Sequence, residues 1–187
     1  MDAHFEDSYC DEDAIYMERN SRDFRRRIAV IDANTLAICE HLRARSLAGP
    51  APPPNAVLKD VFYPKWVTAA HYDACRVRDR GTGAPAGGYG GLFSLTFVSA
   101  AASQAFFDAL PCMKGPSLGT NFTLACPYTI LAHYTELDWA ASWGVEAGLV
   151  RVSLGMEDCA TLLAGFDAAL RAAEAAVARE QAEKSSS

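Results

Sequence analysis

Arg151 is the residue of this sequence whose type and setting point most directly to chemistry. It lies in an apolar segment predicted to be a strand, Leu149–Leu154, in which Arg151 and Ser153 share one face while Val150 and Val152 share the other. A guanidinium there needs an anion, and its planar fork of donors matches a carboxylate. The pattern allows two interpretations, a site for the carboxylate of a small substrate or a structural ion pair with a nearby acid.

Other groups with chemical potential are weaker candidates. The glycines of 87–91 lead into a strand, whereas a phosphate-binding loop follows a strand and opens a helix, so we expect a tight turn or a close backbone approach. The histidines are dispersed and show no metal-ligand spacing: His4, His41, His71 and His133. The six cysteines are scattered among apolar neighbours without a Cys-x-x-Cys pair, which predicts reduced, mostly buried thiols and neither zinc nor disulfides.

Bulk properties narrow the classes of protein. The 187 residues are enough for one domain with a sizeable core, and 50% of them are hydrophobic, so the chain should fold. A net charge of −6 argues against nucleic-acid binding, and the basic run 25–27 indicates a solvated helix face. The acidic N-terminus has no apolar core segment for a signal peptide or a spanning helix, so we expect a cytoplasmic protein and no membrane partner.

Apolar periodicity predicts the elements that position these groups. A helix of about 25 residues begins after a cap at Asn20 or Ser21 and ends before the proline-rich loop 49–54. Strands are predicted at 57–63, 92–97, 122–125 and 149–154. Further helices are predicted after a cap at Ser99, from Leu137 to a left-handed Gly144, and after a cap at Asp158 to near the C-terminus.

These elements describe an α+β domain. A small, mostly antiparallel sheet is covered by helices on one face, and a long helix lies at each end of the chain. We divide the chain into an acidic lead at 1–19, the domain proper at 20–180 and a flexible tail at 181–187.

Four collinear stretches resemble one family of enzymes. They are residues 12–24 (EDAIYMERNSRDF), 87–94 (GGYGGLFS), 114–124 (KGPSLGTNFTL) and 149–158 (LVRVSLGMED). Their order and spacing are similar to the C-terminal domain of the cystathionine gamma-synthases, pyridoxal-phosphate-dependent transsulfuration enzymes with the aspartate-aminotransferase type of fold. The first and third stretches resemble the fungal branch in particular. Collinear motifs on a compatible α+β pattern constrain one another more than any single motif does.

The resemblance implies roles for individual residues. The family's carboxylate-binding arginine falls at Arg151, and the serine and backbone of its Ser-Leu-Gly turn, beside the substrate carboxylate, fall at Ser117, Leu118 and Gly119. Two positions depart from the better-known transsulfuration enzymes: Phe122 stands in place of a glutamate and Ala132 in place of a threonine before His133. Both departures remove polar contacts that could select a substrate. We interpret His133 as a satisfied core histidine near the domain interface.

The resemblance also says what this sequence does not contain. The family's Schiff-base lysine follows a Ser-x-Thr element in a large N-terminal domain, which also holds most of the contacts to pyridoxal 5'-phosphate. The lysines here all lack that context: Lys59, Lys65, Lys114 and Lys184. No catalytic residue is therefore assigned in this chain, which we expect to be inactive alone.

Three functions remain open at this point. The first is gamma-replacement of an activated homoserine by cysteine, a step of sulfur amino-acid metabolism and methionine biosynthesis. The second is a lyase or homoserine-ester sulfhydrylase of the same family, and the third is a non-catalytic binding domain from a truncated or decayed paralogue. The resemblance implies a small amino-acid substrate and a homo-oligomer, the family's tetramer, for the complete protein, and we expect self-association of the chain alone.

Overall fold

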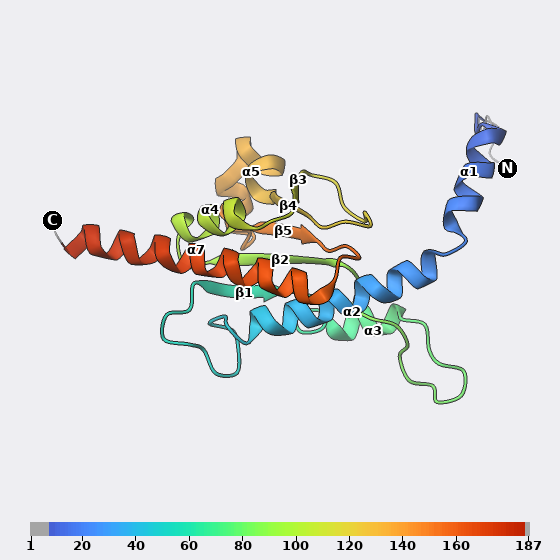
Figure 1. The fold of residues 1–187 in the computed structure, drawn as a ribbon, viewed down its shortest axis with the longest axis horizontal. Coiled ribbons are helices and arrows are strands. Elements are labelled where there is room, and N and C mark those ends of the chain that lie inside the picture. Colours follow the sequence, from blue (N-terminus) through green and yellow to red (C-terminus); the bar gives the residue numbers. More distant parts are fainter. Residues whose placement is uncertain (1–7, 186–187) are drawn as a thin grey trace.

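The structure, a computed structural model, describes residues 8–185 and shows a five-stranded sheet with helices packed on it (Figure 1). The strands are β1 (Leu58–Phe62), β2 (Leu92–Phe97), β3 (Met113–Lys114), β4 (Leu124–Pro127) and β5 (Val150–Ser153). The helices are α1 (Asp11–Ser21), α2 (Phe24–Arg43), α3 (Ala69–Cys75), α4 (Ala100–Ala109), α5 (Tyr128–His133), α6 (Leu137–Ser142) and α7 (Cys159–Ser185), with a short 3-10 helix at Tyr134–Glu136.

The sheet is mixed but mostly antiparallel. Its strand order is β1-β2-β5-β4-β3, and β3 pairs with β4 in parallel while the other neighbours are antiparallel. The predicted α+β class is confirmed, and the strand at 92–97 was predicted to the residue because its apolar alternation is strict. The two-residue strand β3 and the helices α3 and α5 were not predicted.

The core lies between one face of the sheet and the helices. Phe93 and Val152 face it from β2 and β5, and α2, α4 and α7 bring their apolar faces onto the same layer. The ring of Phe166 on α7 lies 6.1 Å from Phe93 and 6.2 Å from Phe106 on α4, measured between centroids. The predicted caps hold these helices in place: the side chain of Ser99 accepts the Ala102 amide at the start of α4.

The predicted first helix is present as α2, but it begins at Phe24, later than predicted, and a separate helix, α1, precedes it. The chain breaks between α1 and α2 at Asp23, whose backbone is non-helical, and Asn20 and Ser21 lie inside or at the end of α1 instead of capping α2. The reason is a lack of packing: α1 buries no residue, and Phe24 and Ile28 at the start of α2 are exposed. A helix without an apolar partner surface has little to hold it continuous with its neighbour.

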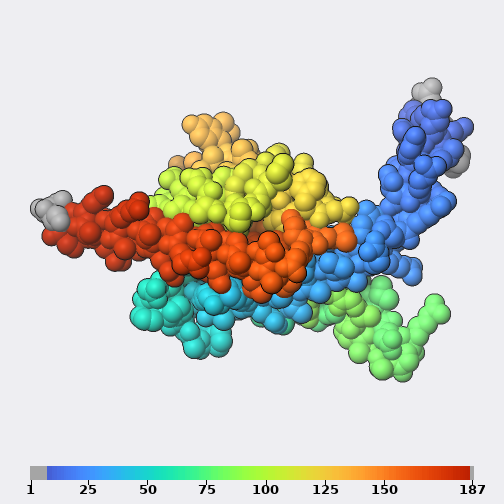
Figure 2. Space-filling view, viewed as in Figure 1, coloured from blue at the N-terminus to red at the C-terminus, as the bar shows by residue number. Residues whose placement is uncertain are grey.

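The two ends of the chain project from the body in opposite directions (Figure 2). Helix α1 contains residues 11–19 of the segment assigned to an acidic lead, of which residues 1–7 lie outside the described part. Helix α7 continues to Ser185, so residues 181–185 of the predicted flexible tail are helical, and residues 186–187 are outside the description. Ala, Glu, Gln and Lys in this stretch are good helix formers, which explains the extension.

The glycine run forms a turn against α2, as predicted. Gly87 and Gly90 adopt φ of 79° and 84°, and the amides of Gly88 and Gly90 each donate to a carboxylate oxygen of Asp32 at 3.0 Å. An added Cβ on Gly88 would lie 2.5 Å from the Asp32 side chain, so only glycine fits this close approach. None of the helices within residues 8–185 is long and apolar enough to cross a membrane.

Candidate functional site

Arg151 sits in the middle of the sheet, on the face away from the helical core. It pairs in register with Ser94 on β2 and with Cys126 on β4, while its neighbours Val150 and Val152 are buried on the other face. The alternation of β5 was thus predicted correctly. A central strand fixes the backbone of Arg151 from both sides, so only its side chain is left to adjust.

The guanidinium of Arg151 is held by neutral groups. Its Nη2 donates to the carbonyl oxygen of Pro116, and its Cζ lies over the ring of Tyr128, 5.1 Å from the centroid. Within residues 8–185 no carboxylate lies within 4.0 Å of it, so the structural ion pair that the sequence allowed is not formed there. The charge of Arg151 is therefore not neutralised by an acid of the described chain.

The turn that contains Ser117, Leu118 and Gly119 lies against the same strand. The Gly119 amide donates to Ser153 Oγ at 2.8 Å, and Gly119 takes a φ of 75°. Arg151 and Ser153 are two residues apart and share a face, so one strand holds both ends of the turn, at Pro116 and at Gly119. The structure thus brings together the four residues that the resemblance assigned to the substrate, with Ser117 and Leu118 exposed.

Beyond the turn, the chain is tied down at its far end. The amide and hydroxyl of Thr123 donate to Glu157 at 2.5 and 2.9 Å, and the Met156 amide donates to the carbonyl of Asn121 at 2.8 Å. Phe122 lies between these ties and is 48% exposed, so it is free to contact a ligand. Sequence reasoning missed Glu157 and Tyr128 as supports of the site. No local sequence pattern marks these two residues, because each contacts a segment that is distant in the sequence: Glu157 binds Thr123, and Tyr128 contacts Arg151.

His133 is half-buried instead of part of the core. Its Nδ1 lies 2.7 Å from Glu136 Oε1, and its ring contacts Tyr128 at 5.8 Å and Trp139 at 6.1 Å between centroids. The predicted core position is wrong because α5 and the 3-10 helix that follows bury only Thr129, and the His133 side chain remains 24% exposed. The neighbouring Ala132 is exposed.

Three of the four lysines are engaged in ways that do not suit a Schiff base. Lys114 Nζ donates to the carbonyls of Phe107 and Leu110 at the C-terminus of α4, where its charge meets the negative end of the helix dipole. Lys59 pairs with Glu146 at 2.6 Å, and Lys65 pairs with Glu40. A lysine that forms an imine must present a desolvated, unpaired amine to the carbonyl, whereas these three amines are already held by carboxylates or backbone carbonyls.

The cysteines are less buried than predicted. All six are free: Cys39 and Cys126 are buried, Cys112 and Cys159 are half-buried, and Cys10 and Cys75 are exposed. The two exposed thiols follow from the openness of the elements that carry them, since α1 and α3 bury no residue. Burial raises the pKa of the Cys126 thiol, although its neighbour Arg151 opposes that effect. Residues 8–185 contain no cluster of His, Cys, Asp or Glu that could hold a metal ion.

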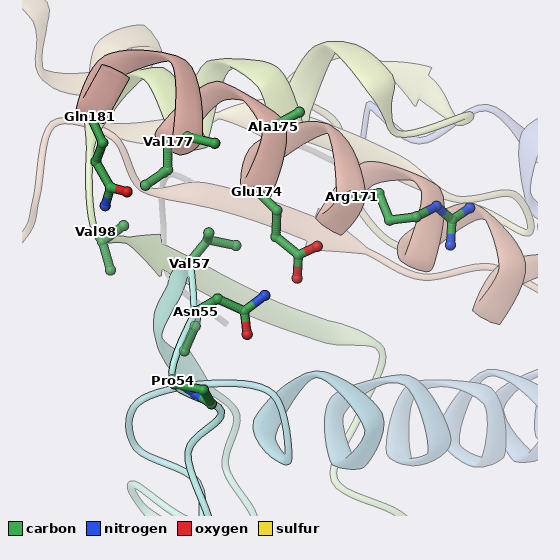
Figure 3. A pocket seen from close by; sticks show the side chains of 11 residues that line it. Pro54, Asn55, Val57, Val98, Arg171, Glu174, Ala175, Val177 and Gln181 are labelled. Carbon is green, nitrogen blue, oxygen red and sulfur yellow. The ribbon is translucent and has the colours of Figure 1, made fainter. Parts of the chain in front are cut away.

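A large groove in the described part of the chain lies away from Arg151. A groove of about 660 Å³ lies between the loop around Asn55 and the C-terminal half of α7, with Arg171 and Glu174 on its α7 wall (Figure 3). Helix α7 packs on the core face of the sheet, so this groove is separated from the Arg151 face by the sheet itself. It has no part in the carboxylate site.

Comparison with known proteins agrees with the resemblance. The chain is 58% identical over 180 residues to the cystathionine gamma-synthase-like enzyme iboG2 of Amanita muscaria, an alignment that covers 93% of this chain and 28% of that protein. It is 45% identical over 170 residues to cystathionine gamma-synthase of Neurospora crassa, with 90% of this chain and 25% of that protein covered. The chain is a C-terminal domain of the cystathionine gamma-synthase family.

A solved structure supports the same assignment. The cystathionine gamma-synthase of Xanthomonas oryzae pv. oryzae, determined in complex with cystathionine, matches this cystathionine gamma-synthase domain with a TM-score of 0.69 at 28% identity, over 88% of this chain and 39% of that one. No model of a known protein family matches the chain. Because the chain spans about 28% of the length of the first of these curated relatives, the activity of a whole enzyme is treated below as a proposal.

Proposed function

We propose that this domain supplies the substrate-carboxylate site of a pyridoxal-phosphate-dependent cystathionine gamma-synthase. That enzyme replaces the gamma-substituent of an activated homoserine with the thiol of cysteine. The observation that carries the proposal is the setting of Arg151, a charged guanidinium on a central strand with no acidic partner in residues 8–185. Such a group favours an incoming carboxylate, and Arg is suited to bind one bidentately.

Within this proposal each residue has a physical task. Arg151 binds the alpha-carboxylate, and Ser117 with the backbone of Leu118 and Gly119 surrounds it from the turn. Ser153 keeps that turn at a fixed distance from Arg151 through its bond to the Gly119 amide. Holding the amino acid in one orientation lowers the entropy that remains to be lost in the reaction.

The residues of this chain do not fit a pyridoxal-phosphate site of their own. Lys59, Lys65 and Lys114 are each held by an acid or by carbonyls, and the chain has no Ser-x-Thr-Lys element. We infer that the cofactor is held by residues outside this sequence, so no step of the carbanion chemistry is assigned to this chain. We also place the complete enzyme in the cytoplasm as a homo-oligomer, in keeping with the family.

Kinetics of a hybrid enzyme test the proposal. In the hybrid, this chain replaces the corresponding C-terminal part of the Neurospora crassa enzyme. Arg151→Ala removes a partly desolvated bidentate contact, so kcat/KM should fall by about 30- to 1,000-fold. Arg151→Lys keeps the charge but loses the planar fork of donors and should recover only part of the loss. Arg171→Ala changes an exposed side chain of α7 and should match the parent. A loss below threefold for Arg151→Ala would assign that residue to structure.

Product analysis of the same hybrid separates the related reactions. Phe122, which follows the turn, and Ala132 on α5 stand where related enzymes have polar residues, and both are exposed, which favours a substrate whose far end is bound without those polar contacts. Cystathionine as product supports the synthase, whereas a keto acid or homocysteine formed directly indicates a lyase or a sulfhydrylase. A hybrid that folds and is inactive with each substrate would favour the non-catalytic binding domain.

A further inference from the structure

A tyrosine that the sequence did not single out lies against the proposed carboxylate arginine. Tyr128 begins α5 directly after β4, and its amide donates to the carbonyl of Leu149 at 3.1 Å, just before β5. Its backbone is therefore fixed to the strand that carries Arg151. The Arg151 Cζ lies over the ring, 5.1 Å from the centroid, within the range of a cation–π contact.

The ring of Tyr128 is itself held in place from another side. His133 meets it in an edge arrangement at 5.8 Å with an interplanar angle of 73°, and the imidazole is anchored in turn by Glu136 at 2.7 Å. The contact with His133 favours one orientation of the ring. In that orientation one face of the ring meets Arg151.

The chemistry of this contact suits a binding arginine. A ring contact uses none of the five N–H donors of a guanidinium, and it adds no negative charge. A carboxylate partner would orient Arg151 equally well, but it would compete with the carboxylate of the substrate. Tyr128 and the Pro116 carbonyl hold the side chain while its charge and most of its donors stay free for a ligand.

We propose that Tyr128 is a positioning residue that holds the Arg151 guanidinium by its ring face and so sets the affinity for the substrate carboxylate. The inference rests on the proposed function of Arg151. In this proposal Tyr128 does not contact the substrate and affects its affinity only by orienting Arg151. The ring is therefore the part that matters, and the phenol hydroxyl has no role.

Substitutions in the hybrid enzyme test the inference. Tyr128→Leu should raise KM for the homoserine substrate by about 5- to 30-fold and change kcat by less than about threefold, because a cation–π contact is lost while the reacting groups are intact. Tyr128→Phe keeps the ring and should match the parent. Tyr134→Leu is the matched control, since the Tyr134 ring is 73% exposed on the adjoining 3-10 helix.

A series of rings of nearly equal shape distinguishes loss of the Arg151 contact from a folding defect of the Tyr128→Leu variant. Phenylalanine carrying one, two and three fluorines at position 128 keeps the shape while it weakens the negative ring face, so KM should rise stepwise along the series. In an Arg151→Ala background the same series should have no effect, because the partner is gone. A flat series, or an equal effect in both backgrounds, would overturn the role of Tyr128 and leave that of Arg151 intact. An Arg151→Ala enzyme with unchanged kinetics would overturn both.

Discussion

Replacing Asp32 by alanine should destabilise the domain, because Asp32 joins α2 to the glycine turn through two backbone amides. Asp32 on α2 accepts the amides of Gly88 and Gly90 at 3.0 Å each, across 56 and 58 residues of sequence. A hydrogen bond to a charged group contributes about 1.5–3 kcal/mol, and both amides would lose their partner in a half-buried turn. Because water can reach part of the site, we expect a loss of about 2–4 kcal/mol in the free energy of unfolding.

Urea and thermal unfolding at low micromolar concentration, followed by circular dichroism, measure this change. For a domain of this size the loss corresponds to a fall in Tm of about 5–12 °C. Asp32→Asn retains one acceptor oxygen and should fall between parent and alanine variant.

The matched control is Asp79→Ala. Asp79 also accepts two turn amides, from Gly81 and Thr82 at 3.0 and 2.8 Å, but it is exposed and ties together only its own loop. Its substitution should shift Tm several times less. If the two alanine variants lower Tm equally, or if Asp32→Ala shifts it by less than about 2 °C, burial and sequence separation do not determine the contribution of these bonds.

Three further predictions concern the core, the pH dependence and the surface. Phe166→Ala should cost about 3–5 kcal/mol in urea unfolding because its ring is buried between Phe93 and α4, and a cost below 1 kcal/mol would contradict that packing. Burial raises the pKa of the Cys39 thiol, so the thiol ionises at lower pH in the unfolded chain than in the folded one, and the free energy of unfolding should fall as pH rises above about 9. Cys39→Ala should reduce this pH dependence, and an unchanged pH dependence would contradict the role of Cys39. The chain alone exposes apolar residues such as Tyr16, which is 60% exposed, and should self-associate at about 100 μM in light scattering, where a monodisperse monomer would refute the expectation.

Elements with local signals were predictable from the sequence, and those that depend on packing were not. The strict alternation of β2 and the caps at Ser99 and Asp158 are encoded within a few residues, and the structure has them where predicted. The apolar spacing through Phe24 and Ile28 correctly predicted the helix α2, but both side chains are exposed, so they do not belong to the buried stripe that the spacing also predicted.

The same distinction holds for the candidate site. Arg151 is conspicuous because its strand is apolar, and the turn at Ser117–Gly119 was located by resemblance. The hydrogen bond between Gly119 and Ser153 joins segments 34 residues apart, and the contact between Tyr128 and Arg151 joins segments 23 residues apart. No sequence pattern within these segments predicts either contact. Contacts of this kind follow from the strand order, which the sequence alone did not determine.

A crystal structure of the hybrid enzyme with an unreactive amino-acid analogue of the substrate tests the central claim most directly. The claim is that Arg151 and the turn at Ser117–Gly119 hold the substrate carboxylate. We predict both carboxylate oxygens about 2.7–2.9 Å from nitrogens of the Arg151 guanidinium, with the turn alongside and the Tyr128 ring still in contact. A carboxylate bound elsewhere, with Arg151 still in contact only with the Pro116 carbonyl and the Tyr128 ring, would contradict the claim.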